Sequence, residues 1–126
     1  MAEIAPLAEL TTIPEFQALT AHYDAIEGTH MRELFAADND RAARFSVEGA
    51  GIFLDYSKNR VTQETLDLLL KLAEARGLRG AIDAMFAGEK INLTEGRAVL
   101  HTALRASRDA TVLVEGKNVV PDVYEV

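Results

Sequence analysis

The most constraining feature of the sequence is an unusually broad apolar surface on one predicted helix, over residues 62–76. On a helical wheel, the apolar side chains of this segment cover an arc of roughly 220°. They are Leu66, Leu68, Leu69, Leu70, Leu72, Ala73 and Ala75. A surface helix of a small domain needs an apolar arc of only about 100°. We therefore expect this helix to have packing neighbours on more than one side.

Residues 1–44 predict a helical arm. After a loose segment over residues 1–11, Thr12 and Glu15 have the spacing of a capping box, and Pro14 suits the first turn of a helix. We expect Gly28 to end this helix. Its apolar residues recur at helical spacing and are expected to face a core; they are Phe16, Leu19, Tyr23 and Ile26. A shorter helix is predicted to follow. It contains Met31, Leu34 and Phe35 and ends near residues 38–40.

Residues 45–60 predict a β-hairpin. The apolar period changes to two, with Phe45 and Val47 alternating before the glycine-rich run of residues 49–51. Alternation resumes after that run, through Ile52, Leu54 and Tyr56. Two alternating segments around a glycine-rich turn are typical of a hairpin.

Residues 61–110 predict further helices, and residues 111–126 predict a strand, a turn and the start of a helix. Gly77 is expected to close the leucine-rich helix, with short helices over residues 78–86 and 94–105. The last of these should bury Val99, Leu100, Ala103 and Leu104. A strand over 111–114 and a turn over 115–118 lead to Pro121, which suits a helix start. One helical turn is too short to offset its nucleation cost, so we expect a truncated helix and a longer parent polypeptide. The fold class is α+β and predominantly helical.

The composition excludes several classes of protein. A net charge of −7 argues against binding a nucleic-acid backbone. The absence of cysteine excludes disulfides and thiolate chemistry. The N-terminus lacks the pattern of a signal peptide, and no apolar run approaches the roughly 20 residues of a membrane span. We therefore expect a cytoplasmic protein with no nucleic-acid or membrane partner.

Three short motifs resemble ligand-binding loops but fit turns better. Residues 49–51 (GAG) lack the third glycine and the following helix of a dinucleotide loop. Gly116-Lys117 lacks the upstream glycine and the following hydroxyl residue of a phosphate loop. Asp38-Asn39-Asp40 resembles the opening of a calcium loop, but Ala42 and Arg44 occupy the next ligand positions.

The histidines and the single Ser-Lys pair show no catalytic or metal-binding spacing. His22, His30 and His101 do not provide the converging ligands of a zinc site, so we expect each to be solvated or partly packed. Ser57-Lys58 could be a nucleophile and its base, but adjacent residues rarely face each other. A solvated turn is the better interpretation of this pair.

A basic stripe is the strongest candidate for binding. If the helix over 94–105 continues, Arg97, His101, Arg105 and Arg108 fall within about 80° of one another. Such a stripe could bind an anion such as a sugar phosphate, or it could pair with the chain's own carboxylates, which we favour. Glu95 could act as a base for aldose–ketose isomerisation, although capping the helix is its more ordinary role.

Three ordered motifs identify a family resemblance. They are residues 51–60 (GIFLDYSKNR), Phe86 with 88–92 (GEKIN), and 94–101 (TEGRAVLH) with 103–105 (ALR). In this order, from about Phe45 to Pro121, the chain resembles the N-terminal part of the phosphoglucose isomerase family. The resemblance implies a scaffold of helices and a hairpin, packed against a larger two-domain α/β isomerase with a sandwich of the sugar-isomerase (SIS) type.

The resemblance also implies the activity and partners of the parent protein. Members of the family interconvert glucose 6-phosphate and fructose 6-phosphate as cytoplasmic dimers without a cofactor, in glycolysis and gluconeogenesis. Their glutamate base, their ring-opening histidine and lysine, and their phosphate-binding serines and threonines lie downstream of the matched region. We therefore predict no catalytic, cofactor-binding or metal-binding residue within 1–126. The expected partners are the remainder of the chain and, in the parent, a second subunit and a sugar phosphate.

Two alternatives to the scaffold remain. The first is a binding module that uses Arg97, His101 and Arg105 for an acidic partner. The second, weaker one is a small complete enzyme that uses Glu95 and His101.

Overall fold

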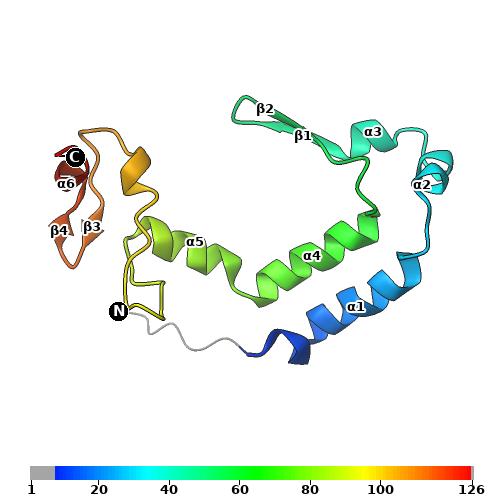
Figure 1. Ribbon diagram of the computed structural model, residues 1–126, viewed down its shortest axis with the longest axis horizontal. Coiled ribbons are helices and arrows are strands. Elements are labelled where there is room, and N and C mark those ends of the chain that lie inside the picture. Colours follow the sequence, from blue (N-terminus) through cyan, green and yellow to red (C-terminus); the bar gives the residue numbers. More distant parts are fainter. Residues whose placement is uncertain (1–7, 126) are drawn as a thin grey trace. The chain divides into compact units, whose positions relative to one another are not determined.

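The structure, a computed structural model, describes residues 8–125 and divides them into two compact units, residues 8–73 and residues 74–125. Figure 1 shows the order of the helices and strands along the chain. Both units combine helices with one two-stranded antiparallel sheet. The chain is therefore α+β, as the sequence predicted. Of the predicted loose segment, residues 1–7 lie outside the described residues.

The first unit begins with a 3-10 turn, η1 (Leu10–Thr12), and helix α1 (Pro14–Ile26). The predicted capping box is wrong, because Ile13 occupies the N-cap position and no side chain caps the helix. The Thr12 hydroxyl instead donates to the Glu9 carbonyl, 2.7 Å away, inside the preceding turn. The helix ends two residues before Gly28.

The apolar face predicted for α1 is only partly correct. Phe16, Leu19 and Ile26 are half-buried, but Tyr23 is 58% exposed. The buried residue of this helix is His22, which is 8% exposed. The side that meets the rest of the unit therefore carries a polar group that helical periodicity did not single out.

Two short helices follow, α2 (Met31–Ala37) and α3 (Arg41–Arg44). His30 caps α2, because its Nδ1 accepts from the Arg32 N–H at 3.1 Å. The Glu33 carboxylate accepts from the His30 N–H in return, which completes a capping box. His30 is thus an exposed residue, as expected, and it also caps a helix, which the sequence did not predict. The sequence did not predict α3.

The predicted hairpin is confirmed as β1 (Ser46–Gly49) and β2 (Ile52–Asp55). Val47 pairs with Leu54 and Gly49 with Ile52, around a turn formed by Ala50 and Gly51. Both turn residues have positive φ, 51° and 75°, as a type I′ turn requires. The GAG run is therefore a hairpin turn and not a dinucleotide loop.

Helices α4 (Gln63–Ala75) and α5 (Leu78–Phe86) match the predicted ranges within one residue, and the boundary between the units falls within α4. Gly77 separates them with a φ of 64°, the left-handed conformation that glycine adopts without strain. Thr65 is the buried residue of α4, whereas Leu69 and Leu70 are 42% and 64% exposed. The broad apolar surface of this helix is thus incompletely covered.

The helix predicted over residues 94–105 is wrong. Asn92 and Arg97 form an isolated antiparallel bridge around a turn, and the Asn92 side chain accepts from the Glu95 N–H at 3.2 Å. Gly96 has a φ of 64°, which no α-helix tolerates. Only the 3-10 turn η2 (Ala103–Arg105) remains of the prediction. The local hydrogen bonding of Asn92 outweighed the apolar spacing further along.

The chain then forms strands β3 (Leu113–Val114) and β4 (Lys117–Asn118) and helix α6 (Val120–Val123). The turn predicted over 115–118 is partly correct: Glu115 and Gly116 form the turn, whereas Lys117 and Asn118 belong to β4 and pair with β3. Pro121 stands in the first turn of α6, as predicted. The Asn118 side-chain oxygen accepts from the N–H groups of Val112 and Val120, at 3.1 and 3.2 Å.

Few apolar side chains are buried. Within residues 8–125 the buried apolar side chains are Phe45 in the first unit and Ala103 and Val120 in the second. Many larger ones are exposed, including Ile52, Phe53, Leu70, Phe86, Leu93 and Leu104. Among the described residues, no helix is both long and apolar enough to cross a membrane.

Candidate functional site

Arg41 is a buried side chain of the first unit, 2% exposed, that makes three hydrogen bonds. Its Nε donates to the Ser57 carbonyl at 2.8 Å, and its Nη2 donates to the carbonyls of Asn59 and Val61 at 2.8 and 2.9 Å. Its guanidinium carbon lies 4.4 Å from the centre of the Phe45 ring. Arg41 thus holds the segment between β2 and α4 by charge-assisted hydrogen bonds and a cation–π contact.

No sequence motif predicts this role of Arg41. The three acceptors of Arg41 are backbone carbonyls 16, 18 and 20 residues further along the chain. Any residue type presents a carbonyl, so no motif marks them. Only the path of the chain brings them to one guanidinium.

Ser57 is the start of the segment that Arg41 holds, and it is 1% exposed. The expectation of a solvated turn is therefore wrong for Ser57, although Lys58 is exposed. The Ser57 N–H donates to the Asp55 carboxylate at 2.9 Å. A buried serine bonded to a carboxylate two residues back is a turn element, and it has no access to a substrate.

The Asp55 carboxylate gives a prediction about pH. Hydrogen bonds from the Ser57 hydroxyl and then from the Ser57 N–H hold the pKa of Asp55 below its ordinary value of 3.8. Because the folded-state pKa is the lower one, this stabilisation is present above pH 3.8 and is lost as the pH falls through the folded-state pKa. We expect Ser57→Ala to raise the pKa of Asp55 toward 3.8, as measured by NMR titration of the carboxyl carbon. An unchanged pKa in that variant would contradict the assignment.

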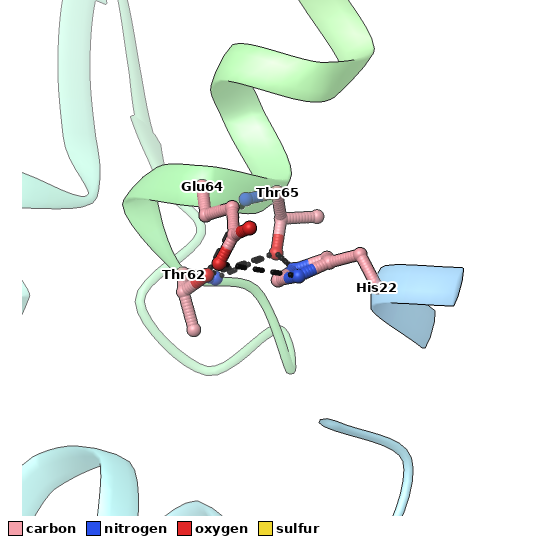
Figure 2. A network of polar contacts seen from close by, with 4 residues as sticks. All are labelled: His22, Thr62, Glu64 and Thr65. Atoms are coloured by element: carbon pink, nitrogen blue, oxygen red, sulfur yellow. Dashed lines mark hydrogen bonds and ion pairs between the residues drawn. The ribbon is translucent and has the colours of Figure 1, made fainter. Parts of the chain in front are cut away.

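A second polar cluster joins α1 to the start of α4. His22 Nε2 lies 2.7 Å from the Thr65 hydroxyl, and His22 Nδ1 lies 3.5 Å from the Glu64 carboxylate. Thr65 in turn accepts from the Thr62 N–H at 2.9 Å and donates its own N–H to the Thr62 hydroxyl at 3.3 Å. Figure 2 shows these four side chains converging between the two helices.

The geometry of this cluster favours one arrangement of protons. The carboxylate of Glu64 attracts a proton to Nδ1 of His22, which leaves Nε2 to accept from the Thr65 hydroxyl. Thr62 and Thr65 together form the capping box of α4. Arg60 adds a further link, because its Nη1 donates to the Glu27 carbonyl at 2.8 Å. The cluster therefore positions helices.

We expect His22→Ala to lower the free energy of unfolding by about 1–3 kcal/mol, because it removes a buried hydrogen bond and its packing. Thr65→Val should cost a similar amount, and the double variant should show a coupling of about 0.5–1.5 kcal/mol. Urea denaturation followed by circular dichroism measures all three.

The exposed histidine His101 provides the matched control. We expect His101→Ala to change the stability by less than about 0.5 kcal/mol. Strict additivity of His22→Ala and Thr65→Val would show that the two side chains do not depend on each other.

The Asp38-Asn39-Asp40 run is occupied by contacts within the unit. One Asp38 carboxylate oxygen pairs with Arg44 at 2.9 Å, and the other accepts from the Asp40 N–H at 3.1 Å. Across the part of the chain that the structure describes, no group of three or more His, Cys, Asp or Glu side chains could hold a metal ion. Lys117, the lysine of the suspected phosphate loop, bonds the Asp122 carboxylate at 2.7 Å.

The structure does not form the predicted basic stripe, because the helix that would align it is absent. Arg97 lies in the turn before η2, 3.7 Å from the Glu95 carboxylate. Arg105 donates to the His101 carbonyl at 3.1 Å, and Arg108 stacks on the Tyr124 ring. Glu95 therefore neither caps a helix nor starts one.

An open depression in the second unit brings His101 and Arg105 together without Arg97. Its lining is Phe86, His101, Thr102, Arg105, Ala106, Thr111 and Val112. The Thr102 hydroxyl oxygen is buried without a hydrogen-bond partner among the described residues. Because that oxygen is sealed from solvent, it cannot serve a ligand in the depression. The binding-module alternative has no support from this geometry, because the structure does not bring Arg97 together with His101 and Arg105.

Comparisons with known proteins agree on one family. The family model described as phosphoglucose isomerase matches residues 55–126. A glucose-6-phosphate isomerase of Deinococcus radiodurans is 62% identical over 120 residues, 95% of this chain and 22% of the relative. Those of Deinococcus deserti and Roseiflexus castenholzii are each 65% identical, over 94% and 93% of this chain and 22% of each relative. The chain thus spans about a fifth of the length of these curated relatives.

Proposed function

This chain belongs to the phosphoglucose isomerase family, and on that premise we propose that it is the N-terminal portion of an enzyme that interconverts glucose 6-phosphate and fructose 6-phosphate. The observation that carries the proposal is an identity of 62% or more to three glucose-6-phosphate isomerases over nearly the whole chain. Such identity over three motifs in one order is far beyond what a shared fold alone produces.

The role of this portion is that of a scaffold. Its buried polar side chains Arg41 and His22 bind backbone carbonyls and a helix cap within the chain. Their donors and acceptors are used to position helices and loops, so the proton transfer between C1 and C2 of the sugar belongs to residues outside 1–126. The parent enzyme acts without a cofactor, as a homodimer in the cytoplasm. The portion packs against a two-domain α/β body with an SIS-type sandwich.

A chimera tests this proposal. The aligned residues of the Deinococcus radiodurans relative are replaced by this chain, and fructose 6-phosphate conversion is measured in a coupled assay. We expect kcat/KM within about tenfold of the relative's own value, a barrier difference of roughly 1.4 kcal/mol. A chimera that folds as the relative does but converts no substrate would contradict the assignment.

Two controls separate the scaffold from the alternatives. The 126-residue chain alone should convert no substrate; turnover by it would place the chemistry within these residues. Charge reversal at Arg97 and Arg105 in the chimera should leave kcat/KM unchanged, because the scaffold proposal gives neither side chain a role in binding the substrate. A large loss of activity with the fold intact would instead support a binding role for them.

A further inference from the structure

One face of the β1–β2 hairpin is apolar and uncovered. Cross-strand pairing of Val47 with Leu54, and of Gly49 with Ile52, places these residues on the same side of the ribbon. Val47, Ile52 and Leu54 are 53%, 68% and 54% exposed. The opposite side carries Ser46, Glu48, Phe53 and Asp55.

The base of this hairpin is fixed, whereas its outer part has no support within the unit. At the base, Phe45 is buried and contacts Tyr56 edge-to-face, with 5.7 Å between the ring centres. The Tyr56 N–H also donates to the Phe45 carbonyl at 2.9 Å. Beyond that point the sheet has only two strands, which can be followed in Figure 1. A two-stranded ribbon is marginally stable until its apolar face is packed.

We propose that the face formed by Val47, Ile52 and Leu54 is a docking surface for the portion of the isomerase polypeptide that lies beyond this chain. The proposal rests on the proposed function. The curated relatives indicate what covers this face. This chain spans only 22% of their length, so most of the isomerase polypeptide lies outside it. The surface that covers the hairpin is apolar, since the face offers three aliphatic side chains and no charge.

The size of the face favours a covalently linked partner over a separate one. Three aliphatic side chains bury a few hundred Å² at most, whereas a stable interface between separate proteins buries about 800 Å² per partner. A segment of the same polypeptide is held at a high effective concentration, so a small contact suffices. A second copy of the chain would need additional surface that the hairpin does not offer.

Hydrogen exchange tests the docking surface. We expect the amides of residues 46–55 to exchange at least about 100-fold more slowly in the chimera than in the isolated 126-residue chain. In the chimera, Ile52→Thr should raise their exchange rate at least tenfold, about 1.4 kcal/mol of opening energy. Glu48→Thr, which places the same β-branched residue on the opposite face, should leave the rate within about twofold.

The outcomes separate this inference from the proposed function. An active chimera whose hairpin exchanges as fast as in the isolated chain would overturn the docking surface alone. Equal effects of Ile52→Thr and Glu48→Thr would also overturn it. Self-association of the isolated chain that Ile52→Thr abolishes, seen by sedimentation, would assign the face to a second copy instead. An inactive chimera with a protected hairpin would contradict the isomerase assignment and leave the docking surface standing.

Discussion

Arg41→Ala is expected to destabilise the first unit by about 3 kcal/mol or more, because it leaves the buried Ser57 carbonyl and the part-buried carbonyls of Asn59 and Val61 without their donor. The variant also removes the guanidinium that stacks on Phe45, one of the few buried apolar side chains. Arg41→Lys should be intermediate, since a single ammonium group cannot reach the carbonyls of Ser57, Asn59 and Val61 with the same geometry. Urea denaturation followed by circular dichroism measures these effects.

Arg44 provides a matched control on the same helix. Its side chain is 51% exposed and forms an ion pair with Asp38. Exposed ion pairs contribute little, so Arg44→Ala should cost less than about 1 kcal/mol. Equal destabilisation by the two alanine variants would show that burial and carbonyl binding do not distinguish Arg41.

Gly88→Ala is expected to disrupt the second unit by about 3 kcal/mol or more, because two penalties act at once. Gly88 has a φ of 73°, and a Cβ added there would lie 2.2 Å from the Leu113 carbonyl oxygen. That oxygen belongs to the backbone of β3, so it cannot rotate away. The backbone at residue 88 must therefore move away from β3. Loss of amide protection at residues 113–118, measured by hydrogen exchange, reports the opening.

Gly96 separates the steric penalty from the conformational one. Its φ of 64° is similar, but a Cβ added there would meet no atom within 4 Å. Gly96→Ala should therefore cost only about 1–2 kcal/mol, the penalty of a left-handed alanine. If Gly88→Ala were no worse than Gly96→Ala, the contact with Leu113 would not be close in solution.

Elements whose signals lie within a few neighbouring residues were predictable from the sequence. The turn at Ala50 and Gly51, the break at Gly77 and the start of α6 at Pro121 each depend on local backbone preferences. The family resemblance was equally accessible, because ordered motifs survive in the sequence whatever their structural role. The helix predicted over 94–105 is wrong because Asn92 and Gly96 favour a turn more strongly than the apolar spacing favours a helix.

The incompletely covered apolar surface of α4 was also foreseeable from the width of its arc. Sequence periodicity can show that a helix has more apolar surface than a small unit can cover. It cannot say which segment covers that surface, because the answer depends on the path of the rest of the chain.

By itself, the sequence determined the α+β class, the hairpin, the two central helices and the family, since each follows from local preferences or motif order. Only the tertiary structure decided that Arg41, Ser57 and His22 are buried and bonded. The physical reason is the separation of their partners along the chain, which is 16 residues for Arg41 and Ser57 and 43 residues for His22 and Thr65. A buried polar side chain is stabilised only by the groups that the folded chain brings to it, and no local pattern specifies those groups.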